Sequence, residues 1–140
     1  MAADGLREQR AAPGSPEADS EYSAGFLASG LPAISAILEQ ERKREDIRPN
    51  VGPQVGRLLG LLVRLTGARR VLELGTSLGY SAVWLGDALR ETDGTLVTVE
   101  CDPSLADAAR KALARAGLSD LADVKTGEAG RMVRQLKGPF

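Results

Sequence analysis

From residue 70 onward, short apolar runs alternate with amphipathic runs, and this alternation constrains the fold more than any other feature of the chain. The apolar runs have the length and composition of β-strands, and the amphipathic runs have helical spacing. Strands that are joined through helices by short connections are parallel, with right-handed crossovers. The sequence therefore predicts an α/β fold with three parallel strands and flanking helices. The predicted strands are RVLEL (70–74), TLVTVE (95–100) and LADVKT (121–126), and the predicted helices are YSAVWLGDALRE (80–91), PSLADAARKALARAG (103–117) and GEAGRMVRQLKG (127–138).

The segment before residue 68 lacks this alternation. Residues 1–20 are small, charged, proline or glycine residues with almost no large apolar ones, so we expect a disordered tail. Residues 21–67 are predicted to form N-terminal helices, and residues 68–140 the α/β region. After a break at RPNVGP (48–53), one helix carries a wide apolar face and ends at Gly67 as its cap. That face consists of Val55, Leu58, Leu59, Leu62, Val63 and Leu65.

Charge and composition exclude several classes of function. The net charge of −1 gives no field that would attract nucleic acid or an anionic membrane. No apolar run approaches the roughly 20 residues needed to span a bilayer, and the N-terminus lacks the apolar core of a signal peptide, so we expect a cytoplasmic protein. The chain has no histidine, the commonest general base and zinc ligand. Its one cysteine, Cys101, lies between Glu100 and Asp102, whose negative charges disfavour a reactive thiolate.

The loop after the first predicted strand is a candidate binding site, because ligands of open parallel sheets bind beyond the carboxyl ends of the strands. Gly75 and Gly79 allow a tight turn and a close approach of the backbone to a ligand. The next helix begins near Tyr80 and Ser81, so its free N–H groups face the same space. Glu73 ends the first strand inside this loop, where a buried carboxylate needs a partner.

The second predicted strand also ends in an acid, Glu100, which can accept hydrogen bonds from both hydroxyls of a ribose. A glycine loop together with a ribose-binding acid indicates a cofactor that contains a nucleoside. In the loop G-T-S-L-G, Ser77 occupies the place of the middle glycine that lets a dinucleotide's pyrophosphate approach. A nucleotide-dependent oxidoreductase is therefore disfavoured, and no P-loop motif is present. Glu73 would instead suit the positive groups of S-adenosylmethionine.

The run E-L-G-x-x-x-G at residues 73–79 resembles motif I of the class I S-adenosylmethionine-dependent methyltransferases. The longer string PQVGRLLGLLVRLTGARRVLELGTSLGYSAVWLGDAL (53–89), followed by GTLVTVECDP (94–103), is similar to the cation-dependent O-methyltransferases. That family includes the catechol and caffeoyl-CoA O-methyltransferases. The resemblance covers roughly residues 31–140 and implies the Rossmann-like methyltransferase fold.

The resemblance also implies roles for individual residues. Val51 would pack on the methionine end of the cofactor, and Glu73 with the backbone of Gly75 and Thr76 would hold its amino-acid part. Ser81 would bind the carboxylate, Glu100 the ribose hydroxyls, and Ala129 would lie by the adenine. Structural alternatives stay open for some of these positions: Gly79 as a turn residue, Val51 and Ala129 as packing residues, and Tyr80 and Trp84 as core. The predicted cofactor-binding residues are Val51, Glu73, Gly75, Thr76, Gly79, Tyr80, Ser81, Glu100 and Ala129.

In this family the metal ligands, the catalytic lysine and the acceptor pocket come after the fourth strand, which would lie beyond Phe140. We therefore expect no catalytic or metal-binding residue among the 140, although the family uses a divalent cation such as Mg²⁺. The expected fold is incomplete and leaves the first strand as an apolar edge, open to aggregation or homodimer formation. The predicted function is methyl transfer from S-adenosylmethionine to a hydroxyl of a small molecule. The alternative is a non-catalytic module or fragment that binds S-adenosylmethionine.

Overall fold

Three parallel strands form the centre of the computed structural model, which describes residues 15–27, 30–46 and 50–140. They are β1 (Arg70–Leu74), β2 (Thr95–Glu100) and β3 (Ala122–Thr126), in the spatial order β1-β2-β3. In the register, Arg70 lies opposite Thr95, and Leu96 lies opposite Ala122. The predicted parallel sheet is confirmed, and β1 is its edge among the described residues.

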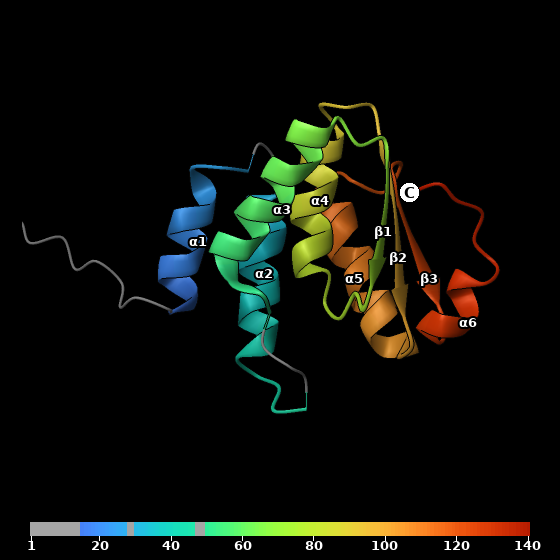
Figure 1. Cartoon of the computed structure of the whole chain (residues 1–140). Coiled ribbons are helices and arrows are strands. Elements are labelled where there is room, and N and C mark those ends of the chain that lie inside the picture. Colours follow the sequence, from blue (N-terminus) through green and yellow to red (C-terminus); the bar gives the residue numbers. More distant parts are fainter. Residues whose placement is uncertain (1–14, 28–29, 47–49) are drawn as a thin grey trace, which may run out of the picture.

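The helices lie in layers on both faces of this sheet (Figure 1). Helices α4 and α5 cover one face and α6 lies on the other, while α1, α2 and α3 pack outside α4 and α5. No helix in the described ranges is both long and apolar enough to cross a bilayer. The helices are α1 (Pro16–Ala24), α2 (Leu31–Glu41), α3 (Gly52–Thr66), α4 (Tyr80–Leu89), α5 (Pro103–Arg115) and α6 (Ala129–Val133).

Helix ends follow the local chemistry of the sequence. Asp102 caps α5, since its carboxylate accepts from the N–H of Ser104 at 2.7 Å. Gly67 ends α3 in the left-handed conformation, as predicted. The expected tail over 1–20 extends too far, because α1 begins at Pro16, where the Ser15 hydroxyl accepts from the N–H of Ala18 at 3.1 Å. Residues 1–14 of that tail lie outside the described residues.

Helix α3 packs on α4 through glycines rather than through its leucines. A Cβ on Gly56 would lie 2.4 Å from Nε1 of Trp84, so only glycine lets the two helices come this close. Trp84 itself is core, at 3 % exposed. The wide apolar face expected for this helix is therefore divided. Val63 is buried and Leu59 is half-buried, whereas Val55, Leu58, Leu62 and Leu65 are exposed.

Candidate cofactor site at the strand ends

The turn between β1 and α4 holds its shape through left-handed residues and hydrogen bonds to β2. Gly75, Ser77 and Gly79 have φ angles of 93°, 50° and 90°. The N–H groups of Gly75 and Thr76 donate to the carbonyl of Val99 at 2.8 and 3.2 Å. Nothing lies within 4 Å of the position where a Cβ on Gly75 would be, so its backbone is open to a ligand. This arrangement brings the end of β1 beside the end of β2.

Glu73 is held by two hydroxyl groups at this end of the sheet. Its Oε1 accepts from Ser81 Oγ at 2.5 Å, and its Oε2 accepts from Thr98 Oγ1 at 2.6 Å. Burial raises the pKa of Glu73, and the hydrogen bonds from Ser81 and Thr98 oppose that rise only in part. The partner that a carboxylate needs in this place is therefore a pair of hydroxyls, with no basic side chain among the residues that bond it.

Glu100 is buried, at 7 % exposed, and its oxygens are bonded by backbone N–H groups. Oε2 accepts from Ser77 at 2.7 Å and Oε1 from Asp102 at 3.0 Å. Burial raises the pKa of Glu100, but these N–H donors outweigh burial and the pKa lies below its ordinary value. The adjacent Glu100 carboxylate raises the pKa of Cys101, which confirms that the thiolate is disfavoured there.

An open cavity of about 240 Å³ lies against these residues. Six of the nine predicted cofactor residues line it, namely Val51, Gly75, Thr76, Tyr80, Ser81 and Glu100. The other three do not: Glu73 lies behind Ser81, Gly79 faces Ala109 of α5 so closely that a Cβ on the glycine would lie 3.4 Å from it, and Ala129 begins α6. At Gly79 the positive φ and this close approach account for the glycine without any ligand.

Sequence reasoning missed four lining residues, Glu41, Asn50, Ser77 and Leu78. Asn50 links the end of α2 to the start of α3. Its Nδ2 donates to Glu41 Oε2 at 2.6 Å, and its Oδ1 accepts from the N–H of Gly52 at 2.6 Å. An asparagine two residues before a helical glycine is a known turn signal, and it could have placed Asn50 here. The contact with Glu41, in contrast, depends on how two helices meet.

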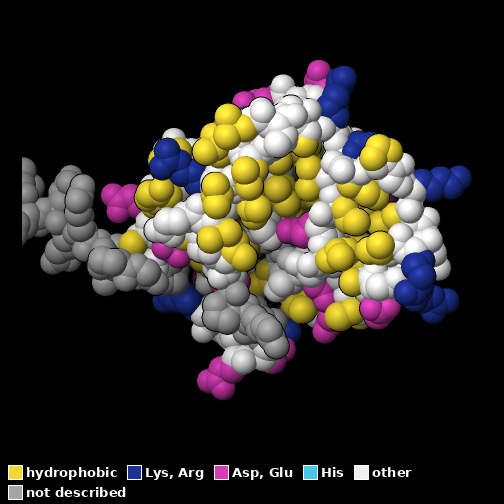
Figure 2. All heavy atoms as spheres, viewed as in Figure 1, with side chains coloured by type: hydrophobic (Ala, Val, Ile, Leu, Met, Phe, Trp, Pro, Cys, Tyr) yellow, Lys and Arg dark blue, Asp and Glu magenta, His cyan; other side chains and the backbone are white. Residues whose placement is uncertain are grey.

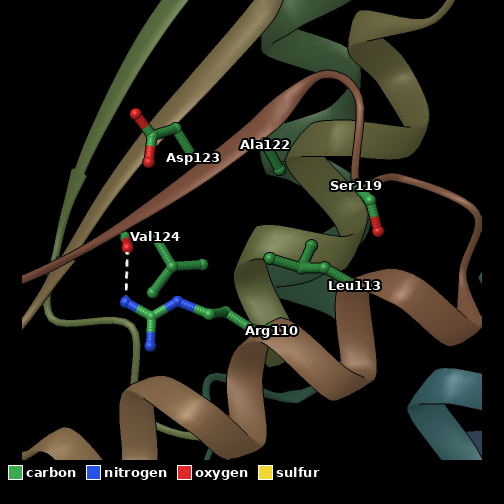
Figure 3. A pocket seen from close by; sticks show the side chains of 6 residues that line it. All are labelled: Arg110, Leu113, Ser119, Ala122, Asp123 and Val124. Carbon is green, nitrogen blue, oxygen red and sulfur yellow. Dashed lines mark hydrogen bonds between the residues drawn. The ribbon is translucent and has the colours of Figure 1, made fainter.

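A second cavity, of about 300 Å³, lies between α5 and β3 (Figure 3). Its one basic side chain among the lining residues, Arg110, points across it to β3. Arg110 Nη2 donates to the carbonyl of Val124 at 2.7 Å and to Thr126 Oγ1 at 2.9 Å, and Nη1 donates to Asp107 at 2.7 Å. The guanidinium is thus used to brace α5 against the strand, and we assign no ligand to this cavity.

The described residues offer no group of three or more His, Cys, Asp or Glu side chains that could hold a metal ion. They therefore do not fit the divalent cation that the sequence resemblance implies.

Comparisons with known proteins agree with this fold. A family described as O-methyltransferase matches residues 26–139. The chain is 39% identical over 116 residues to a catechol O-methyltransferase of Niastella koreensis, covering 80% of this chain and 45% of the relative. An O-methyltransferase structure from Bacillus cereus in complex with S-adenosylhomocysteine (SAH) superposes with a TM-score of 0.72 at 34% identity, covering 86% of this chain and 56% of that one.

A Streptomyces achromogenes O-methyltransferase in complex with S-adenosylmethionine (SAM) gives a TM-score of 0.67 at 36% identity, covering 86% of this chain and 53% of that one. The chain spans about half the length of the curated relatives it matches.

Proposed function

Because the chain belongs to the O-methyltransferase family, we propose that its strand-end cavity binds SAM and that the chain supplies the donor-binding half of a methyltransferase. The observation that carries this proposal is the pairing of two carboxylates at adjacent parallel strand ends. Glu73 is bonded to Ser81, and Glu100 is bonded to the backbone of the turn between β1 and α4. Glu100 and Ser81 line one cavity that an exposed glycine backbone also lines, and Glu73 lies behind Ser81.

Each part of the cavity has a group of SAM that suits it. Glu100 is ionised and can accept from two ribose hydroxyls while its backbone donors keep it in place. The start of α4 has no side-chain cap, so its first N–H groups, including that of Ser81, can bind a carboxylate. We infer that Glu73, which lies behind Ser81, attracts the ammonium group next to that carboxylate through its charge.

The reaction that we propose is transfer of a methyl group to a hydroxyl oxygen of a small molecule. SAM supplies the methyl group on a sulfonium centre. The residues of this chain bind and orient that donor, which lowers the entropy cost of bringing two reactants in line. A non-catalytic module that binds SAM is the second candidate, and it is favoured by the lack of a metal-binding cluster among the described residues.

Calorimetric titration of the 140-residue chain with SAH tests the binding. We expect Glu100→Ala to weaken binding at least about tenfold, because a hydrogen bond to a charged group contributes about 1.5–3 kcal/mol. Asp123→Ala, at an exposed acid on β3, is the matched control and should leave binding unchanged. Binding of NADH in place of SAH would overturn the proposal.

A methyl-transfer assay then separates the enzyme from the module. It uses radiolabelled SAM, Mg²⁺ and catechol as the probe acceptor, with the 140-residue chain as the only protein. Labelled product above the level given by Glu100→Ala supports the enzyme. Binding of SAH without any labelled product supports the module.

A further inference from the structure

The cavity is acidic in a way that the binding of a nucleoside does not require. Two carboxylates line it, Glu41 and Glu100, and a third, Glu73, is bonded to the lining hydroxyl of Ser81. Its described lining contains no lysine or arginine. Glu73 and Glu100 have roles in the proposed function, but Glu41 has none.

Glu41 ends α2 and is half-buried. Its one hydrogen bond to a described side chain comes from Asn50, and within the described ranges no lysine or arginine forms an ion pair with it. A carboxylate that loses water without gaining a cation is costly in the free protein. Such a group attracts a positive charge that enters the same cavity.

SAM and its product SAH differ by one methyl group and one positive charge. The ribose, the ammonium and the carboxylate are common to both molecules. Glu73, Ser81 and Glu100 are matched to these shared groups, so they do not distinguish donor from product. A charge that acts on the sulfur can do so.

We propose that Glu41 makes the cavity prefer the sulfonium donor to the uncharged thioether product. The inference rests on the proposed function, since it assumes that the cavity holds SAM. Its geometric basis is the wall formed by Glu41, Asn50 and Val51, which faces the cavity together with the strand-end residues. Val51 is also the residue at which the family resemblance expects the methionine end of the cofactor. Because Glu41 acts on the bound donor, it lowers the donor's dissociation constant and gives no additional stabilisation to the transition state.

The test compares dissociation constants for SAM and SAH, measured by calorimetry on the 140-residue chain at pH 7.5. Glu41→Gln removes the charge but keeps an oxygen that can accept from Asn50. We expect it to weaken SAM binding roughly three- to tenfold, as for a charge pair at partly screened separation. Binding of SAH should change by less than about twofold, because that ligand carries no sulfonium charge.

Two further variants separate charge from structure. Glu41→Ala also removes the acceptor for Asn50, so both ligands should lose affinity while the preference for SAM falls as in Glu41→Gln. Glu39→Gln removes a charge from the exposed face of α2 and should alter neither ligand's affinity.

An equal loss for both ligands in Glu41→Gln, or no loss for either, would overturn the inference. Failure of the unmodified chain to bind SAM or SAH would instead overturn the proposed function, and the inference with it.

Discussion

The two edges of the sheet are built differently. At β3, Asp123 and Lys125 form an ion pair at 2.7 Å along the strand, and Arg110 donates to the strand carbonyl of Val124. Charged side chains of this kind discourage another strand from pairing with an edge. At β1, the end of the strand is apolar and Leu74 is 52 % exposed. The β3 edge is protected, and the β1 edge is not.

The unprotected edge continues into the exposed part of α3. Figure 2 shows hydrophobic side chains gathered across the middle of the face that carries α3 and β1. The exposed apolar residues of this α3 stripe are Val55, Leu58, Leu61, Leu62 and Leu65. Patches of this kind mark interaction or aggregation surfaces.

The backbone of β1 is also open on this side. The carbonyl of Arg69 accepts from Thr95 and the N–H of Gly75 donates to Val99, so alternation turns the peptide groups of Leu72 and Leu74 away from β2. At the start of the strand, the Arg70 side chain donates to the carbonyl of Lys137 at 2.9 Å. Homodimer formation through this edge stays a prediction.

The largest effect that we expect concerns which side of α3 belongs to the core. Gly56→Ala would place a methyl group against the Trp84 ring, which is buried. Overpacking should outweigh the better helix propensity of alanine, for a net loss of about 2 kcal/mol in the free energy of unfolding. Urea denaturation measures it. Leu62→Ala, on the exposed stripe, is the control and should stay within about 0.5 kcal/mol of the unmodified chain. A larger loss of stability in Leu62→Ala than in Gly56→Ala would place the core on the other side of α3.

The second effect concerns self-association through β1. Leu74→Lys puts a charge on the open edge and should weaken self-association at least about tenfold, or about 1.4 kcal/mol. Sedimentation velocity over a range of protein concentrations measures it. Val133→Lys, at an exposed apolar residue of α6, adds the same charge elsewhere and should leave association as it was. Equal effects of the two variants would show that net charge, rather than the β1 edge, controls association.

The third effect concerns the protected edge. Arg110→Ala removes the bonds to Val124 and Thr126 and should lower the free energy of unfolding by about 1 kcal/mol. It should also increase self-association, because the β3 edge loses its cover. Asp107→Ala removes only the exposed ion pair with Arg110 and should change stability by less than about 0.5 kcal/mol. If Arg110→Ala leaves both stability and association unchanged, the β3 edge owes its protection to something else.

The sequence predicted the sheet and the positions of its two acids, Glu73 and Glu100, well. Both depend on the succession of strands and helices along the chain. Strand–helix alternation determines a parallel sheet, and a parallel sheet brings Glu73 and Glu100 to the same end. The burial of α3 was less predictable. The many leucines of α3 suggest that their side of the helix faces the core. The buried contact with Trp84 instead depends on Gly56, and a glycine adds no hydrophobicity to a periodic pattern. Likewise, Glu41 enters the cavity only because α2 ends beside Asn50.

The smallest effect distinguishes the two acids at the open end of the sheet. Burial raises the pKa of Glu73 above the ordinary 4.5, so its ionisation costs stability, and this cost develops as the pH rises from 4.5 through the folded-state value. The pKa of Glu100 is lowered, so its stabilising effect is present above pH 4.5 and is lost as the pH falls through its folded-state value. Relative to the unmodified chain, Glu73→Gln should therefore gain stability as the pH rises from 4 to 7, and Glu100→Gln should lose it. Thermal unfolding across this range measures both differences. If both variants change in the same direction, then the burial of Glu73 and the N–H groups around Glu100 do not set the two pKa values apart as described.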